Sequence, residues 1–258
     1  MMGTSHLKSG KPCQDASVCE LLTCSDSRPV LVAVVSDGAG SAKYSDLGSA
    51  LACSLFVDAM KGFVHEGNEI NQLNRAFFEA WLTRFQGKIK QRAADMALVP
   101  RDFACTLVAA VISEDCAVFV QIGDGAIVIE SPEEPDTYSW VFWPQQGEYE
   151  NTTYFATDSH ASQFLQFDIF QHHGCKEVAL FSDGLQRLAL HYQSQSAFSP
   201  FFRPFFQVLR AQEEVVSEQY MNSLAAFLDS KVVNERTDDD KTLILATRRT
   251  IPSINAEL

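Results

Sequence analysis

Four short β-rich runs, separated by turn residues, occupy the middle of the chain and constrain its fold more than any other feature. The runs cover residues 106–112, 117–122, 126–130 and 138–143. Between the second and third runs stands Asp124-Gly125, a dipeptide that is a strong β-hairpin signal when apolar runs flank it. The pattern predicts an antiparallel meander rather than an array of βαβ units.

The segment before this region mixes one strand with long helices. Residues 30–36 are almost entirely apolar and predict a buried strand. Apolar residues at helical spacing then predict a helix over 45–63, with Ser45 as its N-cap. A second helical region is predicted over 69–98, with a break at Gly87.

The segment after the meander repeats this mixture. Residues 177–181 predict a buried strand, residues 205–228 a helix, and residues 242–247 a final strand. Helices therefore flank a mostly antiparallel β core, which places the chain in the α+β class. Since no stretch has the composition of a linker, residues 1–258 are predicted to form a single domain.

Charge and hydropathy exclude several classes of protein. The 258 residues include 33 Asp and Glu but only 20 Lys and Arg, a formal net charge of −13. No basic stripe exists to neutralise phosphates, so a nucleic-acid partner is not expected. The longest aliphatic run, residues 30–35, is too short to span a membrane, and the N-terminus has no apolar signal segment. Phosphate chemistry in such a chain would need positive charge from elsewhere, such as a metal.

The cysteines give a prediction about the compartment. There are seven, an odd number, and no two of them form a C-x-x-C pair. Several lie inside apolar runs, where cysteine behaves as a small hydrophobic residue. A zinc site or a disulfide framework is therefore not expected, and a reducing cytoplasm is the predicted location.

Acidic residues stand where predicted core strands begin or end. Asp37, Asp124 and Asp183 each follow a strand, Asp239 precedes the last one, and Asp15 lies near the N-terminus. Strand ends meet at one edge of a sheet, so these carboxylates can converge there. Clustered carboxylates repel one another unless they are protonated or bind cations. An all-oxygen site suits a hard octahedral cation, Mg²⁺ or Mn²⁺.

Taken singly, each of these motifs has a plainer interpretation. Asp-Gly is a common turn dipeptide, and the acidic run 238–240 has the composition of a solvated loop. The order of the motifs carries more information. In sequence they are Gln14-Asp15-Ala16, Asp37-Gly38-Ala39-Gly40, Ala104-Cys105-Thr106-Leu107, Gly123-Asp124-Gly125, Ser182-Asp183-Gly184-Leu185 and Asp239-Asp240-Lys241-Thr242.

This ordered set resembles the type-2C, metal-dependent serine/threonine protein phosphatases, and the resemblance extends from about Gly3 to Thr247. It implies a four-layer α-β-β-α sandwich, in which two mostly antiparallel sheets are flanked by helices. It also implies a binuclear Mg²⁺ or Mn²⁺ site at one sheet edge. By this resemblance, Asp37 would bridge the two ions, and Gly38 would offer its carbonyl oxygen to one of them.

The resemblance assigns roles to the other acidic residues as well. Asp183 and Asp239 would ligate the second ion, Asp15 would hold metal-bound water, and Asp124 would support a weaker third position. The implied reaction is hydrolysis of phosphomonoesters, with a metal-bound hydroxide attacking phosphorus in line. Asp37, Asp15 and Asp183 are then the candidate catalytic residues. No covalent enzyme intermediate is required.

The sequence departs from the family pattern at the substrate phosphate. Many members have an arginine five residues before the N-terminal aspartate, where this chain has Gly10. Lys11, Lys8 and His6 are candidates to take its place, and Lys43, after the glycine turn, is another.

Four further departures surround the predicted metals. Ala39 stands where some members have a histidine proposed as general acid, and Gln14 replaces a frequent glutamate. Arg187 occupies a position where many members have an aspartate, which puts the third metal in question. Asp240 replaces the usual asparagine. The carboxylates of the two-metal core are retained.

Three functions stay open at this point. The first is a phosphatase acting on phosphorylated proteins, with a kinase as a possible partner. The second is a regulatory module that keeps the fold and binds without turnover. The third is a phosphohydrolase for small molecules, for which a deep enclosed pocket would be expected rather than an open cleft.

Overall fold

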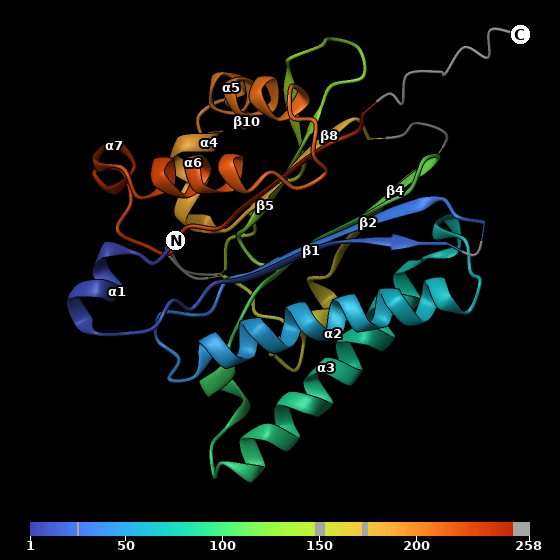
Figure 1. Ribbon diagram of the computed structural model, residues 1–258. Helices are drawn as coiled ribbons and strands as arrows, with labels where there is room; N and C mark the ends of the chain where they lie inside the picture. The colour runs from blue at the N-terminus through green and yellow to red at the C-terminus, as the bar shows by residue number, and fades with distance from the viewer. Residues whose placement is uncertain (25, 148–152, 172–174, 250–258) are drawn as a thin grey trace, which may run out of the picture.

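Two antiparallel β-sheets packed face to face form the centre of the protein, with helices on both outer faces (Figure 1). The computed structural model describes residues 1–24, 26–147, 153–171 and 175–249. Helices α2 and α3 cover the outer face of one sheet, and α4, α5 and α6 cover the outer face of the other. The predicted four-layer α-β-β-α arrangement is confirmed.

The larger sheet has five strands in the order β1-β2-β3-β4-β7. These strands are β1 (Ala16–Thr23), β2 (Pro29–Ser36), β3 (Leu107–Ile112), β4 (Cys116–Ile122) and β7 (Gln166–Gln171). The smaller sheet has the order β11-β8-β5-β6, and its strands are β11 (Leu243–Thr247), β8 (Glu177–Phe181), β5 (Ala126–Glu130) and β6 (Tyr138–Phe142). A short pair, β9 (Leu190–His191) and β10 (Ser196–Ala197), stands apart.

The helices that cover the two outer faces come from different parts of the chain, and the short α1 bonds instead to Asp238 and Asp240 before β11. The first part of the chain forms α1 (Thr4–Ser9), α2 (Ser45–His65) and α3 (Arg75–Asp95), and the last part forms α4 (Gln186–Ala189), α5 (Ser199–Arg210), α6 (Glu218–Leu228) and α7 (Lys231–Asn234). Short 3₁₀ turns occupy Ile70–Gln72, Pro100–Phe103, Ala161–Gln163 and Asp183–Leu185.

The apolar sequence of β2 follows from its position between two apolar layers. Side chains alternate across a strand. Val32 and Val34 belong to the core shared with α2 and α3, whereas Ala33 and Val35 belong to the core between the sheets. All four are buried, so the strand has no polar face. The predicted buried strand over 30–36 is confirmed.

Helix α2 is the one described helix that is long and apolar enough to cross a membrane by length and composition. Its apolar side chains have a different use here, because Ala52, Phe56, Met60 and Val64 are buried in the core. They pack with Trp81 of α3, whose ring meets that of Phe56 edge-on at 5.5 Å. Packing against the sheet and α3 therefore accounts for the composition of α2.

The predicted hairpin at Asp124-Gly125 is wrong. Strand β4 pairs with β3 and β7 in the larger sheet, while β5 pairs with β6 and β8 in the smaller one. Both edges of β4 are already occupied, so the chain leaves one sheet at Asp124 and enters the other. The dipeptide forms a crossover, and this places Asp124 where the two sheets meet.

Helix boundaries also differ from the predictions. Tyr44, not Ser45, flanks the start of α2, and Ser45 is its first buried residue. Gly87 lies inside the unbroken α3, and that region is interrupted earlier, where Asn74 caps α3 by accepting a hydrogen bond from the Phe77 N–H. The helix predicted over 205–228 is two helices, because the Ser217 side chain caps a new start.

Candidate metal centre

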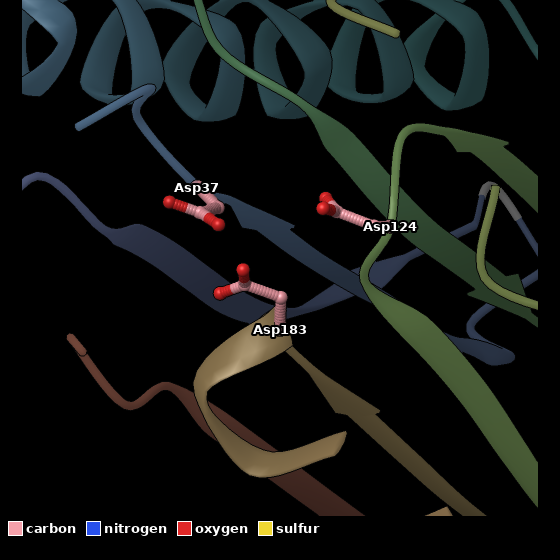
Figure 2. Close-up of side chains that lie close together, drawn as sticks. All are labelled: Asp37, Asp124 and Asp183. Carbon is pink, nitrogen blue, oxygen red and sulfur yellow. The ribbon is translucent and has the colours of Figure 1, made fainter. Parts of the chain in front are cut away.

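Three carboxylates from distant parts of the chain meet where the two sheets come together. Asp37 follows β2, Asp124 joins β4 to β5, and Asp183 follows β8. One oxygen from each lies within 4.8 Å of the others, and Figure 2 shows the side chains pointing toward a common space. The convergence expected at a sheet edge therefore occurs for these three residues.

The backbone of Asp37 is held by Thr106 on the neighbouring segment. The Asp37 N–H donates to Thr106 Oγ1 (3.0 Å), and the Thr106 N–H donates to the Asp37 carbonyl (2.8 Å). Gly38 comes next, and a Cβ there would lie 2.6 Å from the Gln14 carbonyl oxygen. Only glycine lets the N-terminal segment pass this close, which explains the Asp-Gly sequence.

Asp15 lies on that N-terminal segment and is fixed by two hydroxyl groups. Ser182 Oγ donates to Asp15 Oδ2 at 2.7 Å, and Thr242 Oγ1 donates to the same oxygen at 2.8 Å. Ser182 and Thr242 also bond to each other through their N–H groups. Three motifs far apart in sequence are thus joined at one carboxylate.

Two oxygens of the cluster have no hydrogen-bond partner among the described residues. They are Asp15 Oδ1 and Asp124 Oδ1, and both are buried. A buried acceptor left without a partner is costly. Carboxylate oxygens aimed into a shared space are ligands that Mg²⁺ and Mn²⁺ prefer. These residues therefore fit a divalent cation.

The pKa shifts of the clustered carboxylates also indicate a site for divalent cations. Burial, followed by the charges of Asp15 and Asp183, raises the pKa of Asp37 well above its usual range. Burial and the charges of Asp124 and Asp239 raise the pKa of Asp183 to about 7. Burial is also the main cause that raises the pKa of Asp124 to about 6 and that raises the pKa of Asp15. Without cations, the cluster keeps protons near neutral pH.

Asp239 stands apart from the group of three. It is exposed, and it lines an open cleft of about 1100 Å³ together with Asp124 and Asp183. Its Oδ1 accepts the N–H of Asp240 at 2.8 Å. Asp239 thus lies at the rim of the cluster, where its charge acts on the pKa of Asp183.

Asp240 faces inward and fixes the N-terminal segment. Its Oδ1 accepts the Gly3 N–H (2.6 Å), and its Oδ2 accepts the Gln14 N–H (2.6 Å) and contacts His6 Nδ1 (2.9 Å). Burial would raise the pKa of Asp240, but the hydrogen bonds from Gln14 and Gly3 and the His6 partner hold it below its usual value. Asp240 is therefore a structural anchor beside Asp239.

Three of the four residues predicted to hold the substrate phosphate have other contacts, and the fourth, Lys8, is exposed and does not line the cleft. His6 is buried, and its ring contacts Asp240 rather than the cleft. Lys11 Nζ donates to the Gly40 carbonyl at 2.7 Å, and Lys43 Nζ lies over the Tyr44 ring at 5.0 Å from its centroid. None of the three lines the cleft.

Sequence reasoning gave no role to Thr106, Ser182 or Thr242, although each stands inside one of the six ordered motifs. Each is a hydroxyl residue next to a strand end, and each holds Asp15 or the backbone of Asp37 by a hydrogen bond. The signal was their place in the motifs, since hydroxyl groups there can donate to the neighbouring acid.

Cys13 is the cysteine closest along the chain to Asp15. Burial, with the charges of Asp240 and Asp15, raises the pKa of its thiol to about 11. A thiol with that pKa stays protonated at neutral pH and is a poor nucleophile. This agrees with the expectation that no covalent enzyme intermediate is required.

A two-sheet sandwich with an all-oxygen carboxylate cluster at the junction of its sheets has the ligands that a metal-dependent hydrolase needs. Residues 2–229 match the family model described as Protein phosphatase 2C, so the chain belongs to that family of metal-dependent enzymes. Over 249 residues it is 38% identical to Serine/threonine-protein phosphatase 3 of Escherichia coli (strain K12), covering 95% of this chain and 94% of that protein.

Solved structures share the fold at lower identity. Serine/threonine phosphatase Stp1 from Staphylococcus aureus is similar with a TM-score of 0.60 at 16% identity, covering 93% of this chain and 91% of that chain. RsbX in complex with magnesium has a TM-score of 0.51 at 16% identity, covering 91% of this chain and 87% of that chain. The sequence-based assignment to the type-2C family is confirmed.

Proposed function

We propose that the protein is a Mg²⁺- or Mn²⁺-dependent phosphatase that removes phosphate from phosphoserine and phosphothreonine in proteins. The observation that carries the proposal is the group of Asp37, Asp124 and Asp183, with oxygens within 4.8 Å, beside an open cleft. The family and the 38% identity to a serine/threonine-protein phosphatase support it.

Asp37, Asp124 and Asp183 would hold the cations, with Asp239 joining from the rim of the cleft. We propose two ions, with a third position near Asp124. When bound, such ions offset the charge of the phosphoryl oxygens and lower the pKa of bound water. The chain itself, with a net charge of −13, provides little positive charge for a phosphate.

Asp15 has a different task in this proposal. Its Oδ2 is occupied by Ser182 and Thr242, and its Oδ1 has no partner among the described residues. The free oxygen is an acceptor held in a fixed orientation beside the cluster. It is suited to orient a water molecule by hydrogen bonding, and the two hydroxyl donors keep the carboxylate from turning away.

The shape of the cleft favours a protein substrate. It is open and extends from the carboxylates along the 234–239 loop. A flexible phosphorylated segment can enter such a cleft, whereas small ligands are usually enclosed. A kinase that phosphorylates the same substrates is then a natural partner. We also propose a reducing, cytoplasmic location, which the seven unpaired cysteines support.

Hydrolysis of a phosphothreonine peptide by the purified protein tests the function. We expect phosphate release with Mn²⁺ and none with a chelator. Asp37→Asn should lower kcat at least about a hundredfold, since losing a direct ligand costs more than the 10–100-fold typical of outer-shell partners. Asp238→Asn, at an exposed residue of the same cleft, is the matched control and should keep near wild-type activity.

Two results would contradict the proposal. One is phosphate release that neither chelator nor Asp37→Asn affects. The other is Mn²⁺ that stabilises the wild-type fold without any turnover of phosphopeptides, which would indicate a binding module. Faster turnover of small phosphomonoesters than of phosphopeptides would instead identify a small-molecule phosphohydrolase.

A further inference from the structure

We propose that Arg187, on the wall of the cleft, binds the phosphoryl group of the substrate. The inference rests on the proposed phosphatase function and identifies the cation that the function needs. It moves the contact with phosphate from the N-terminal segment to the turn that follows β8.

Three cations near the N-terminus already have contacts within the protein. His6 is buried in its contact with Asp240, and Lys11 Nζ is bonded to a backbone carbonyl. Lys43 lies over the ring of Tyr44. Each would have to give up an existing contact to meet a phosphate, and none of them lines the cleft.

The cleft itself is lined by other basic residues. Arg187 and Arg236 are the two basic residues among its described lining. Both are exposed, and neither guanidinium forms an ion pair or a side-chain hydrogen bond with another described residue. The carboxylates Asp124, Asp183 and Asp239 line the same cleft, but none of them lies within ion-pair distance of either guanidinium. Both cations are therefore available to a ligand in the cleft.

Arg187 and Arg236 differ in how they are connected to the carboxylate cluster. Asp183 begins the helical turn shown in Figure 2, and Arg187 stands four residues further on, in α4. The 3₁₀ turn that begins at Asp183 runs directly into α4, so Arg187 and Asp183 line the cleft from one short segment. Arg236 lines it from the segment that follows α7.

Side-chain hydrogen bonds hold the segment that carries Arg187 in place. Gln186 Nε2 donates to the Asp124 carbonyl, and the Tyr192 hydroxyl donates to Gln186 Oε1. Burial raises the pKa of Tyr192, the charges of Asp124 and Asp183 raise it further, and Arg187 opposes them. Tyr192, Arg187, Asp124 and Asp183 all line the one cleft. The turn carrying Arg187 is tied to the crossover carrying Asp124 through Gln186.

An arginine at position 187 is well suited to bind a phosphoryl group. Its planar guanidinium can bond two phosphoryl oxygens at once, and its charge does not depend on pH in the working range. A cation on the wall lets the substrate phosphoryl group approach a cluster that is otherwise negative.

The test compares Arg187→Ala with wild type on a phosphothreonine peptide with Mn²⁺. Loss of one charge-assisted contact should raise KM about tenfold and raise the inhibition constant of inorganic phosphate by a similar factor, with a smaller change in kcat. Arg187→Lys should recover part of the KM. Two further readouts do not need turnover: stabilisation by inorganic phosphate should weaken in Arg187→Ala, and stabilisation by Mn²⁺ alone should not change.

Two comparison variants make the outcome decisive. Arg84→Ala removes an exposed arginine from α3 in the opposite layer and should match wild type. Arg236→Ala should raise KM less than Arg187→Ala does. Unchanged KM and phosphate inhibition in Arg187→Ala, or a larger effect of Arg236→Ala, would overturn the inference while wild-type turnover still upholds the phosphatase. Absence of wild-type turnover would instead count against the proposed function.

Discussion

The side chain of Asp240 alone holds several groups of the N-terminal segment in place. Its two oxygens accept the backbone N–H groups of Gly3 and Gln14 and contact the ring of His6. An asparagine would place an NH₂ group where one of these donors points, so two donors would face each other. The carboxylate is therefore matched to this N-terminal segment, even though the family pattern has asparagine here.

We predict that Asp240→Asn destabilises the fold by about 1–3 kcal/mol, because a buried N–H loses its acceptor. The expected fall in Tm is roughly 3–10 °C for a chain of this size. Thermal unfolding measures it, with Asp238→Asn as the control, since that neighbour is exposed. A Tm equal to that of wild type would show that the amide satisfies the same contacts.

At the scale of the element, the turn after β8 depends on a close contact with the loop before β11. A Cβ on Gly184 would lie 1.9 Å from the Asp240 carbonyl oxygen. No side chain fits there without moving one of the two segments. The Ser-Asp-Gly sequence thus reflects packing between two segments as well as a turn.

Gly184→Ala is predicted to destabilise the protein by about 1–3 kcal/mol and to lower activity, because the displaced turn carries Asp183. Gly87→Ala is the matched control: Gly87 is exposed within α3, with nothing within 4 Å of the added Cβ. That change should stabilise the fold by about 0.5–1 kcal/mol. Denaturant unfolding of both variants checks the pair, and equal effects of the same sign would contradict the argument.

Some elements could be predicted from the sequence and others could not, for physical reasons. Strand β2 was evident because both of its faces are buried, so its apolar run has no interruption. Strand β1 was missed because it alternates between half-buried and exposed positions along its whole length at a sheet edge. The crossover at Asp124 was predicted as a hairpin, because a dipeptide does not reveal which sheet its flanking strands join.

The carboxylates of the site could be found from their order along the chain, but their supports could not. Asp37 and Asp183 follow apolar strands, which is a local signal. The anchoring of Asp15 by Ser182 and Thr242 depends on contacts over 167 and 227 residues. No local pattern encodes such contacts, and the same holds for the burial of His6.

For the whole molecule, the carboxylate cluster couples stability to pH and to metal. In the metal-free fold the pKa of Asp124 is about 6 and that of Asp183 about 7, against 3.8 for an ordinary aspartate. Between pH 4 and 7 the folded state therefore binds more protons than the unfolded state. The contribution of these two groups to the free energy of unfolding then falls as pH rises through this window.

We predict that, in chelator, the free energy of unfolding is lower at pH 8 than at pH 5 by on the order of 2 kcal/mol. Mn²⁺ should restore stability at pH 8, because cations replace the protons. Asp183→Asn should reduce the pH dependence and the effect of Mn²⁺ together. Denaturant unfolding at the two pH values measures this, and a metal-free protein that is more stable at pH 8 would contradict it.

The anchoring of Asp15 has a consequence for the order in which the protein is made. Asp15 leaves the ribosome early, whereas Ser182 and Thr242, which fix its carboxylate, are translated much later. Strand β1 must wait for its partner β2, and the carboxylate must wait for the start of β11. A nascent chain therefore has no assembled centre while it is being translated, and a product released before Thr242 lacks one of the two hydroxyl donors. The carboxylate of Asp15 therefore gains both of its donors only after residue 242 has been synthesised.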